Sequence, residues 1–261
     1  MGKIIAIALN TFRESIRDRV FYSLLAFAML MLGFSMILGN LTIGNPLKII
    51  QDFGLGMISL FGILIAIFVG IGLVYKEMEK RTIFVILAKP IARWQFLTGK
   101  YLGLSLTLMI EVIIMTIGMF VICYFQTPYF LEKRLIHWEL FYAIIPIVFE
   151  LQLILAVALF FSSFSSPFLS GLFTLAVFVI GHTSMDLKAL ADKTDDVILQ
   201  AICNTLYYVL PNLENLNFKA RVVHNLNISI NEIGFSILYA VLYTSATLLL
   251  AMIIFQNRDI K

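Results

Sequence analysis

Six long apolar runs, separated by short polar stretches, constrain this chain more than any other feature of its 261 residues. A helix needs about 20 apolar residues to cross the hydrocarbon core of a bilayer. Hydrophobic residues make up 61% of the sequence and charged residues 13%, so the chain lacks the polar surface of a soluble domain. The sequence therefore predicts an all-α membrane protein with six transmembrane helices, over residues 20–39, 53–75, 101–125, 139–161, 168–183 and 234–256.

Three further segments flank these spans. Residues 1–19 carry apolar side chains on one helical face and polar ones on the other, as in a helix that lies flat at a membrane interface. A charged loop covers residues 76–100. Residues 184–233 form the longest loop, in which apolar residues at helical spacing after Thr194 predict a re-entrant or interfacial helix. We therefore expect an N-terminal interfacial helix followed by a single transmembrane domain over residues 20–261.

The Lys and Arg residues are distributed unevenly between the two sets of loops. Twelve lie in the N-terminal segment, the 76–100 loop and the C-terminal end, against seven in the loops on the other side. Loops rich in Lys and Arg stay in the cytoplasm. The bias therefore predicts a multi-pass protein of the cytoplasmic (inner or plasma) membrane, with both termini cytoplasmic and the 184–233 loop external.

The loop over residues 76–100 reads KEMEKRTIFVILAKPIARWQFLTGK. Its charged entry is followed by an apolar stretch, and Pro90 then breaks any helix. This pattern predicts a short helix and a sharp turn at the inner face of the membrane. Taken alone, it fits equally well an ordinary positively charged loop that only fixes topology.

The same stretch, extended to Gly103, resembles the cytoplasmic loop in the membrane subunits of ABC exporters of the type-two permease class. Four features are shared. The loop begins with acidic residues, Glu77 and Glu79, followed by Thr82. A Leu-Ala-x-Pro sequence that ends in Arg covers Leu87–Arg93, and a Gly-Lys sequence at the start of the next span covers Gly99–Gly103. Arg81, where many members have Gly, and the external Tyr207–Phe218 resemble the branch with permeases used in nitrous-oxide-reductase maturation and gliding-related transport.

This resemblance implies a permease subunit that exports a substrate using ATP hydrolysed by a separate cytosolic protein. In relatives the loop forms a coupling helix that sits in a cleft of the ATPase. The contact is therefore expected at Glu77, Glu79, Lys80, Arg81 and Thr82. The implied partners are two copies of an ABC ATPase, a second permease that is identical or related, and the lipid bilayer, with no nucleic acid.

The chain lacks the Gly-x-x-x-x-Gly-Lys-Ser/Thr pattern of a phosphate-binding loop. We therefore expect no enzymatic activity and no cofactor in the chain itself, with ATP and Mg bound by the partner ATPase.

Two carboxylates, Glu111 and Glu150, lie inside predicted spans, each near the expected midplane of the bilayer. Ionisable groups at that depth are costly and usually face a cavity or a partner. Both are therefore candidates for the lining of a substrate path. The alternative is a hydrogen bond between packed helices, for which Gln152 is a candidate partner of Glu150.

The cysteines and histidines give weaker signals. Cys123 and Cys203 both fall on the predicted external side, where a disulfide can persist, but a small apolar role is the favoured interpretation of each. The three histidines, His137, His182 and His224, also fall externally and lack metal-ligand spacing, so no metal site is expected.

Two other functions fit parts of the pattern. A membrane anchor or sensor that recruits a cytosolic partner, without transport, would use the same charged loop. An intramembrane enzyme would need converging acid, base and nucleophile groups, and Glu111 with Glu150 alone gives it little support. For a transporter, an aromatic-rich and Met-rich path suits a lipid, a peptide, a saccharide or a drug.

Overall fold

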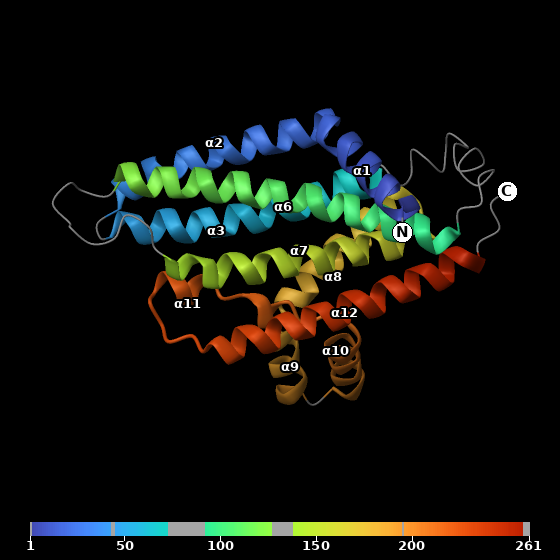
Figure 1. Cartoon of the computed structure of the whole chain (residues 1–261). Coiled ribbons are helices and arrows are strands. Elements are labelled where there is room, and N and C mark those ends of the chain that lie inside the picture. Colours follow the sequence, from blue (N-terminus) through green and yellow to red (C-terminus); the bar gives the residue numbers. More distant parts are fainter. Residues whose placement is uncertain (1, 43–44, 73–91, 127–137, 195, 258–261) are drawn as a thin grey trace.

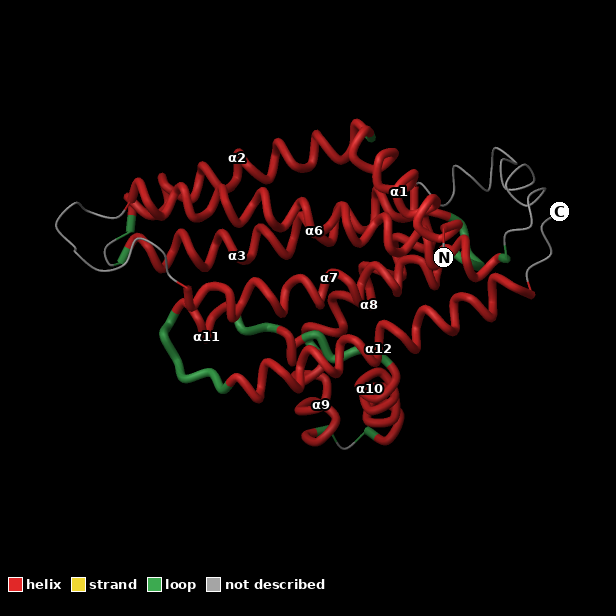
Figure 2. Tube along the Cα trace, viewed as in Figure 1, coloured by secondary structure: helices red, strands yellow, loops and turns green. Residues whose placement is uncertain are grey.

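The computed structural model describes residues 2–42, 45–72, 92–126, 138–194 and 196–257, and within these ranges the chain forms helices and turns without a strand (Figures 1 and 2). Among them, five helices are long and apolar enough to cross a membrane. The bent pair α8 (Pro167–His182) and α9 (Ser184–Lys193) raises the number to six if it counts as one span. The predicted all-α membrane fold is confirmed.

The long helices run side by side as a bundle, and α1 (Gly2–Arg17) and the last turns of α12 (Ile230–Asn257) both lie at one end of it, which we call the α1 end (Figure 1). A core of aliphatic and Met side chains, including Leu32, Ile58, Met115 and Leu151, joins them. The elements of the bundle are α2 (Arg19–Leu41), α3 (Pro46–Ile65) with its π-helical continuation η1 (Ala66–Ile71), α6 (Arg93–Gln126), η2 (Trp138–Leu140), α7 (Phe141–Ser162) and α12 (Ile230–Asn257).

Helices α3 and α6 begin seven and eight residues earlier than the apolar runs predict. Helix α3 begins at Pro46 rather than residue 53, because Asn45 caps it by accepting a hydrogen bond from the Leu47 N–H at 3.1 Å. Helix α6 begins at Arg93 rather than residue 101, because Phe96 and its neighbours are buried against other helices. Residues 93–100 of the predicted loop are therefore the first two turns of α6, and residues 76–91 lie outside the described part of the chain.

Helix α1 (Gly2–Arg17) packs against the first turns of α6. Its buried side chains are the small Ala8, Thr11 and Ser15, whereas Ile5 and Leu9 are exposed. Exposed apolar side chains on a helix at the end of a membrane bundle suit contact with lipid. The interfacial position of this segment stays a prediction.

The segment between α8 and α12 is largely helical. Helices α9 and α10 (Val197–Val209) pack together as a hairpin that projects from the side of the bundle (Figure 1). Asp196 begins α10 by accepting hydrogen bonds from the N–H groups of Ile198 and Leu199 at 2.9 and 3.5 Å. After the hairpin, η3 (Glu214–Leu216) and α11 (Lys219–Val223) return to the bundle and are partly buried in it.

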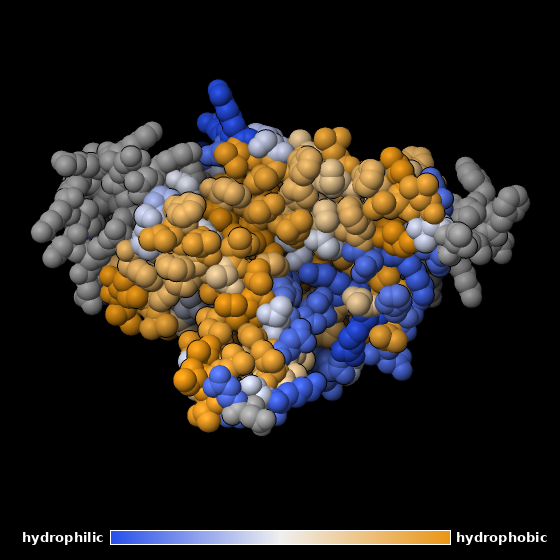
Figure 3. Space-filling model, turned by 180° about the vertical axis from the view of Figure 1, so that it is seen from behind, coloured by the Kyte–Doolittle hydropathy of each residue, from blue (hydrophilic) through white to orange (hydrophobic). Residues whose placement is uncertain are grey.

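Apolar and hydrophilic residues are unevenly distributed over the surface of the bundle. Seen from behind, apolar residues cover most of the long helices, and hydrophilic residues gather on the half of the molecule away from the α1 end, beside the projecting hairpin (Figure 3). The polar surface thus coincides with the return of η3 and α11 to the bundle.

Candidate functional site

Glu150 lies near the middle of α7, and its side chain is fully buried, with 0% exposure. One carboxylate oxygen, Oε1, accepts a hydrogen bond from the Ser59 hydroxyl of α3 at 3.2 Å and lies 2.8 Å from His182 Nε2. The other, Oε2, lies 3.9 Å from the Lys219 ammonium of α11. Three separate parts of the chain therefore converge on one carboxylate.

His182 is the last residue of α8, where the chain bends by 64° into α9. The Phe178 ring, one turn earlier, meets the imidazole edge-on with ring centres 4.6 Å apart and so fixes its orientation. On the opposite side of the imidazole, Nδ1 lies 3.6 Å from Oε2 of Glu214. His182 therefore stands between a buried carboxylate and a half-exposed one.

A close backbone approach brings Glu214 and Lys219 to this place. The Leu213 N–H donates to the Gly181 carbonyl at 3.0 Å. A Cβ atom at Gly181 would lie 2.7 Å from the Pro211 carbonyl oxygen, so any larger residue would push the segment away. Leu213, Leu216 and Phe218 are buried beside it and anchor the return of the chain.

The charges of this cluster are arranged to offset the burial of Glu150. An isolated carboxylate in an apolar interior is strongly destabilised, and pairing with cations and hydrogen-bond donors reduces that penalty. Lys219 supplies the positive charge and keeps 16% of its side chain exposed, so its own desolvation is incomplete. We call Ser59, Glu150, His182, Glu214 and Lys219 the central cluster.

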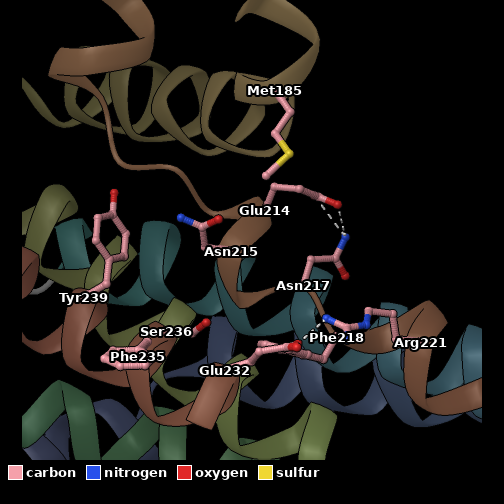
Figure 4. Close-up of a pocket in the computed structure, with 10 residues that line it drawn as sticks. All are labelled: Met185, Glu214, Asn215, Asn217, Phe218, Arg221, Glu232, Phe235, Ser236 and Tyr239. Carbon is pink, nitrogen blue, oxygen red and sulfur yellow. Dashed lines mark hydrogen bonds and ion pairs between the residues drawn. The ribbon is translucent and has the colours of Figure 1, made fainter. Parts of the chain in front are cut away.

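A pocket of about 530 Å³ opens next to the central cluster (Figure 4). Glu214 belongs to both, since it lines the pocket and faces His182. Its carboxylate accepts hydrogen bonds from the Asn217 amide at 3.1 and 3.3 Å. An ion pair in the wall joins Arg221 and Glu232 at 2.8 Å. A chain of polar groups thus leads from the pocket through Glu214 and His182 to Glu150.

Glu111, the other predicted candidate, is also fully buried, in the middle of α6. Neither of its oxygens has a hydrogen-bond partner within the described ranges, and there it shares no hydrogen bond or ion pair with Glu150. The structure therefore does not bring the two carboxylates into one site. Their roles along a substrate path stay predictions.

A hydrogen bond between packed helices, the alternative for Glu150, is present, but its partner is Ser59 and not the candidate Gln152. Within the described residues the Gln152 side-chain oxygen is buried without a hydrogen-bond partner, and its backbone carbonyl accepts a 3.5 Å hydrogen bond from Tyr101. The sequence did contain a signal for His182, because a histidine ends the fifth apolar run. Lys219 lies in the long loop, and the sequence carries no pattern that places it near the bundle centre.

The remaining predicted residues are placed as follows. Glu77, Glu79, Lys80, Arg81 and Thr82 lie outside the described residues. Cys123 in α6 and Cys203 in α10 are both buried, and within the described residues no disulfide joins them. In the described part of the chain, no three His, Cys, Asp or Glu side chains form a group able to hold a metal ion.

Apolar helices around a buried charged cluster define a multi-pass membrane protein whose interior can accommodate polar groups. The chain belongs to the ABC-2 transporter family, since the model described as "ABC-2 family transporter protein" matches residues 5–260. It is therefore the membrane component, or permease subunit, of an ABC transporter rather than a catalytic subunit. Family membership implies that the chain lies in a lipid bilayer and pairs with a cytosolic ABC ATPase. A search of curated proteins found no match.

The central cluster predicts a graded response to changes at Glu150. Glu150→Gln keeps groups that can bond to Ser59 and His182, whereas Glu150→Leu leaves both without their partner. An unsatisfied buried polar group costs about 1–3 kcal/mol, so the Leu variant should unfold at a clearly lower temperature than the Gln variant. Thermal unfolding in detergent measures the difference. The control is Glu139→Leu at an exposed position, and equal midpoints for both Glu150 variants would contradict the assignment.

Proposed function

We propose that this permease subunit exports a substrate across the cytoplasmic membrane. A separate cytosolic ATPase binds ATP and Mg and drives the movement. The observation that carries the proposal is the polar chain from the pocket through Glu214 and His182 to the buried Glu150. Buried ionisable groups inside a membrane bundle typically mark a path for polar solutes. Export, rather than import, rests on the resemblance of the charged loop to exporter loops.

The orientation is part of the proposal. The excess of Lys and Arg in one set of loops supports a cytoplasmic α1 end, where both termini lie, and a pocket on the external side. The complex would hold two ATPases and a second permease, identical or related. Arg81 and Tyr207–Phe218 support the branch that includes nitrous-oxide-reductase maturation and gliding-related permeases.

The contact with the ATPase is assigned to residues 76–91, which carry Glu77, Glu79, Lys80, Arg81 and Thr82. Charged groups across an interface steer association and fix its register. A motor that acts from the cytosol must meet the permease at the membrane surface, and this loop is the most charged segment on the predicted cytoplasmic side.

The orientation is tested with single cysteines at Lys80 and Lys193. A membrane-impermeant maleimide should label Lys193→Cys in intact cells and Lys80→Cys only in inverted vesicles, because the two positions lie on opposite sides. Labelling of both from the same side would overturn the orientation.

The ATPase contact is tested by charge reversal. Glu77→Lys with Glu79→Lys adds positive charge to a segment already rich in Lys and Arg, so the purified permease should lose its bound ATPase or fail to stimulate it. The measurements are the stoichiometry of the co-purified ATPase and its turnover in nanodiscs. Glu139→Lys, predicted to be external, is the matched control and should keep both.

Each outcome separates the competing functions. Unchanged ATPase binding and turnover in the double variant would remove residues 76–91 from the contact. A co-purified cytosolic partner without ATPase activity would favour the membrane anchor or sensor instead.

The substrate path is tested by comparing the two buried carboxylates. In the complex with its ATPase, Glu150→Gln should keep assembly but change ATP turnover, because the charge that Lys219 and His182 face is removed. Glu111→Gln is the matched variant, since it removes an equally buried carboxylate that lies outside the central cluster. Equal turnover in Glu150→Gln and the native complex would assign Glu150 to packing alone.

A further inference from the structure

Arg93, the first residue of α6, contacts the far end of the chain. Its guanidinium Nη1 donates hydrogen bonds to the backbone carbonyls of Phe255 and Gln256, each at 3.0 Å. These carbonyls belong to the last described turn of α12, within which none of the described residues is basic. The last carbonyls of a helix have no partners within the helix and carry its partial negative charge. Arg93 therefore caps α12 from another helix.

An apolar contact reinforces this cap. Phe96, one turn after Arg93, stacks on Phe255 with ring centres 6.1 Å apart and planes 16° from parallel. Both rings are buried. The start of α6 therefore holds the end of α12 by charge-assisted hydrogen bonds and by ring packing together.

The first turns of α6 also pack against α1. A Cβ atom at Gly99 would lie 2.7 Å from the Ile7 Cβ, and one at Gly103 would lie 2.5 Å from the Ala8 carbonyl oxygen. The spacing of the two glycines, four residues apart, lets the helix backbones approach closely. The first turns of α6 thus contact both α1 and α12, directly after the segment assigned to the ATPase contact.

Helix α12 connects this end of the bundle with the pocket. It has 28 residues, which at 1.5 Å per residue is a length of about 40 Å. It packs along α7, the helix that carries Glu150, and its first turns supply Glu232, Phe235, Ser236 and Tyr239 to the pocket wall. A rigid helix held at one end and lining a pocket at the other transmits displacement between the two.

We infer that Arg93 is a positioning residue that passes motion from the ATPase-contacting loop to α12, and through α12 to the pocket. The inference rests on the proposed function, because the motion originates in the ATPase. Arg93 itself lies after the contact residues, so a substitution of Arg93 leaves ATPase binding intact. The same substitution uncouples ATP hydrolysis from movement at the pocket.

The experiment reads the pocket end of α12 without a known substrate. Ser236→Cys in the pocket wall is labelled with an impermeant maleimide in the permease–ATPase complex in nanodiscs, before and after nucleotide is trapped with vanadate. Cys123 and Cys203 are buried, and a complex without Ser236→Cys gives their background. With native Arg93, trapping should change the labelling rate.

The test compares three variants of the complex, each carrying Ser236→Cys. Arg93→Gln should trap as much nucleotide as the native complex but show a change in labelling about ten-fold smaller, as expected when charge-assisted hydrogen bonds are lost. Arg93→Lys, which keeps a cation near the carbonyls, should restore most of the change. Arg13→Gln removes the same charge at an exposed position of α1 and should match the native complex.

Three outcomes would overturn the inference. They are a native-like change in Arg93→Gln, a loss of ATPase binding in Arg93→Gln, or no change at Ser236 in a native complex that traps nucleotide. The proposed function fails separately, if the native permease binds no ATPase at all.

Discussion

A carboxylate buried among apolar helices is tolerated only when other groups stabilise its charge, and Glu150 imposes this requirement on the structure. Its partners come from α3, α8 and α11, so the segment after the hairpin must return into the bundle. Helix α8 ends at His182, and Gly181 leaves room for the returning backbone. The bend in the fifth span and the neighbouring pocket both follow from the meeting of these groups.

The sequence predicted the parts of the fold that depend on local pattern. Apolar runs of bilayer length located the long helices, and apolar residues at helical spacing after Thr194 located α10. The prediction from the sequence was less accurate where packing between distant segments determines where a helix begins. Helix α6 extends back to Arg93 because α1 and α12 bury its first turns, and no residue within that stretch encodes those neighbours.

The same distinction applies to the candidate site. Glu150 stands out in the sequence because a charge inside an apolar run is costly. Of its charged partners, His182 gives a weak signal as a histidine at the end of the fifth apolar run, and Lys219 gives none because it lies in a long polar loop. The polar loop residues enter the bundle because Leu213, Leu216 and Phe218 bury apolar surface beside them. These apolar residues stand singly among polar ones, so the length of apolar runs does not reveal that the segment is buried.

The two ends of α12 are held by different kinds of contact, and this difference affects how motion passes from the ATPase end to the pocket. At the α1 end, Arg93 and Phe96 combine a helix cap with buried ring stacking, a contact that resists separation. At the pocket end, the side chains of the Arg221–Glu232 pair are 38% and 49% exposed, and ion pairs at exposed positions contribute roughly 0–1 kcal/mol. A displacement of α12 would therefore break this ion pair before it breaks the contacts at Arg93. Movement that begins at the firmly held end is expressed at the weakly held end, beside Glu214 and the polar chain to Glu150.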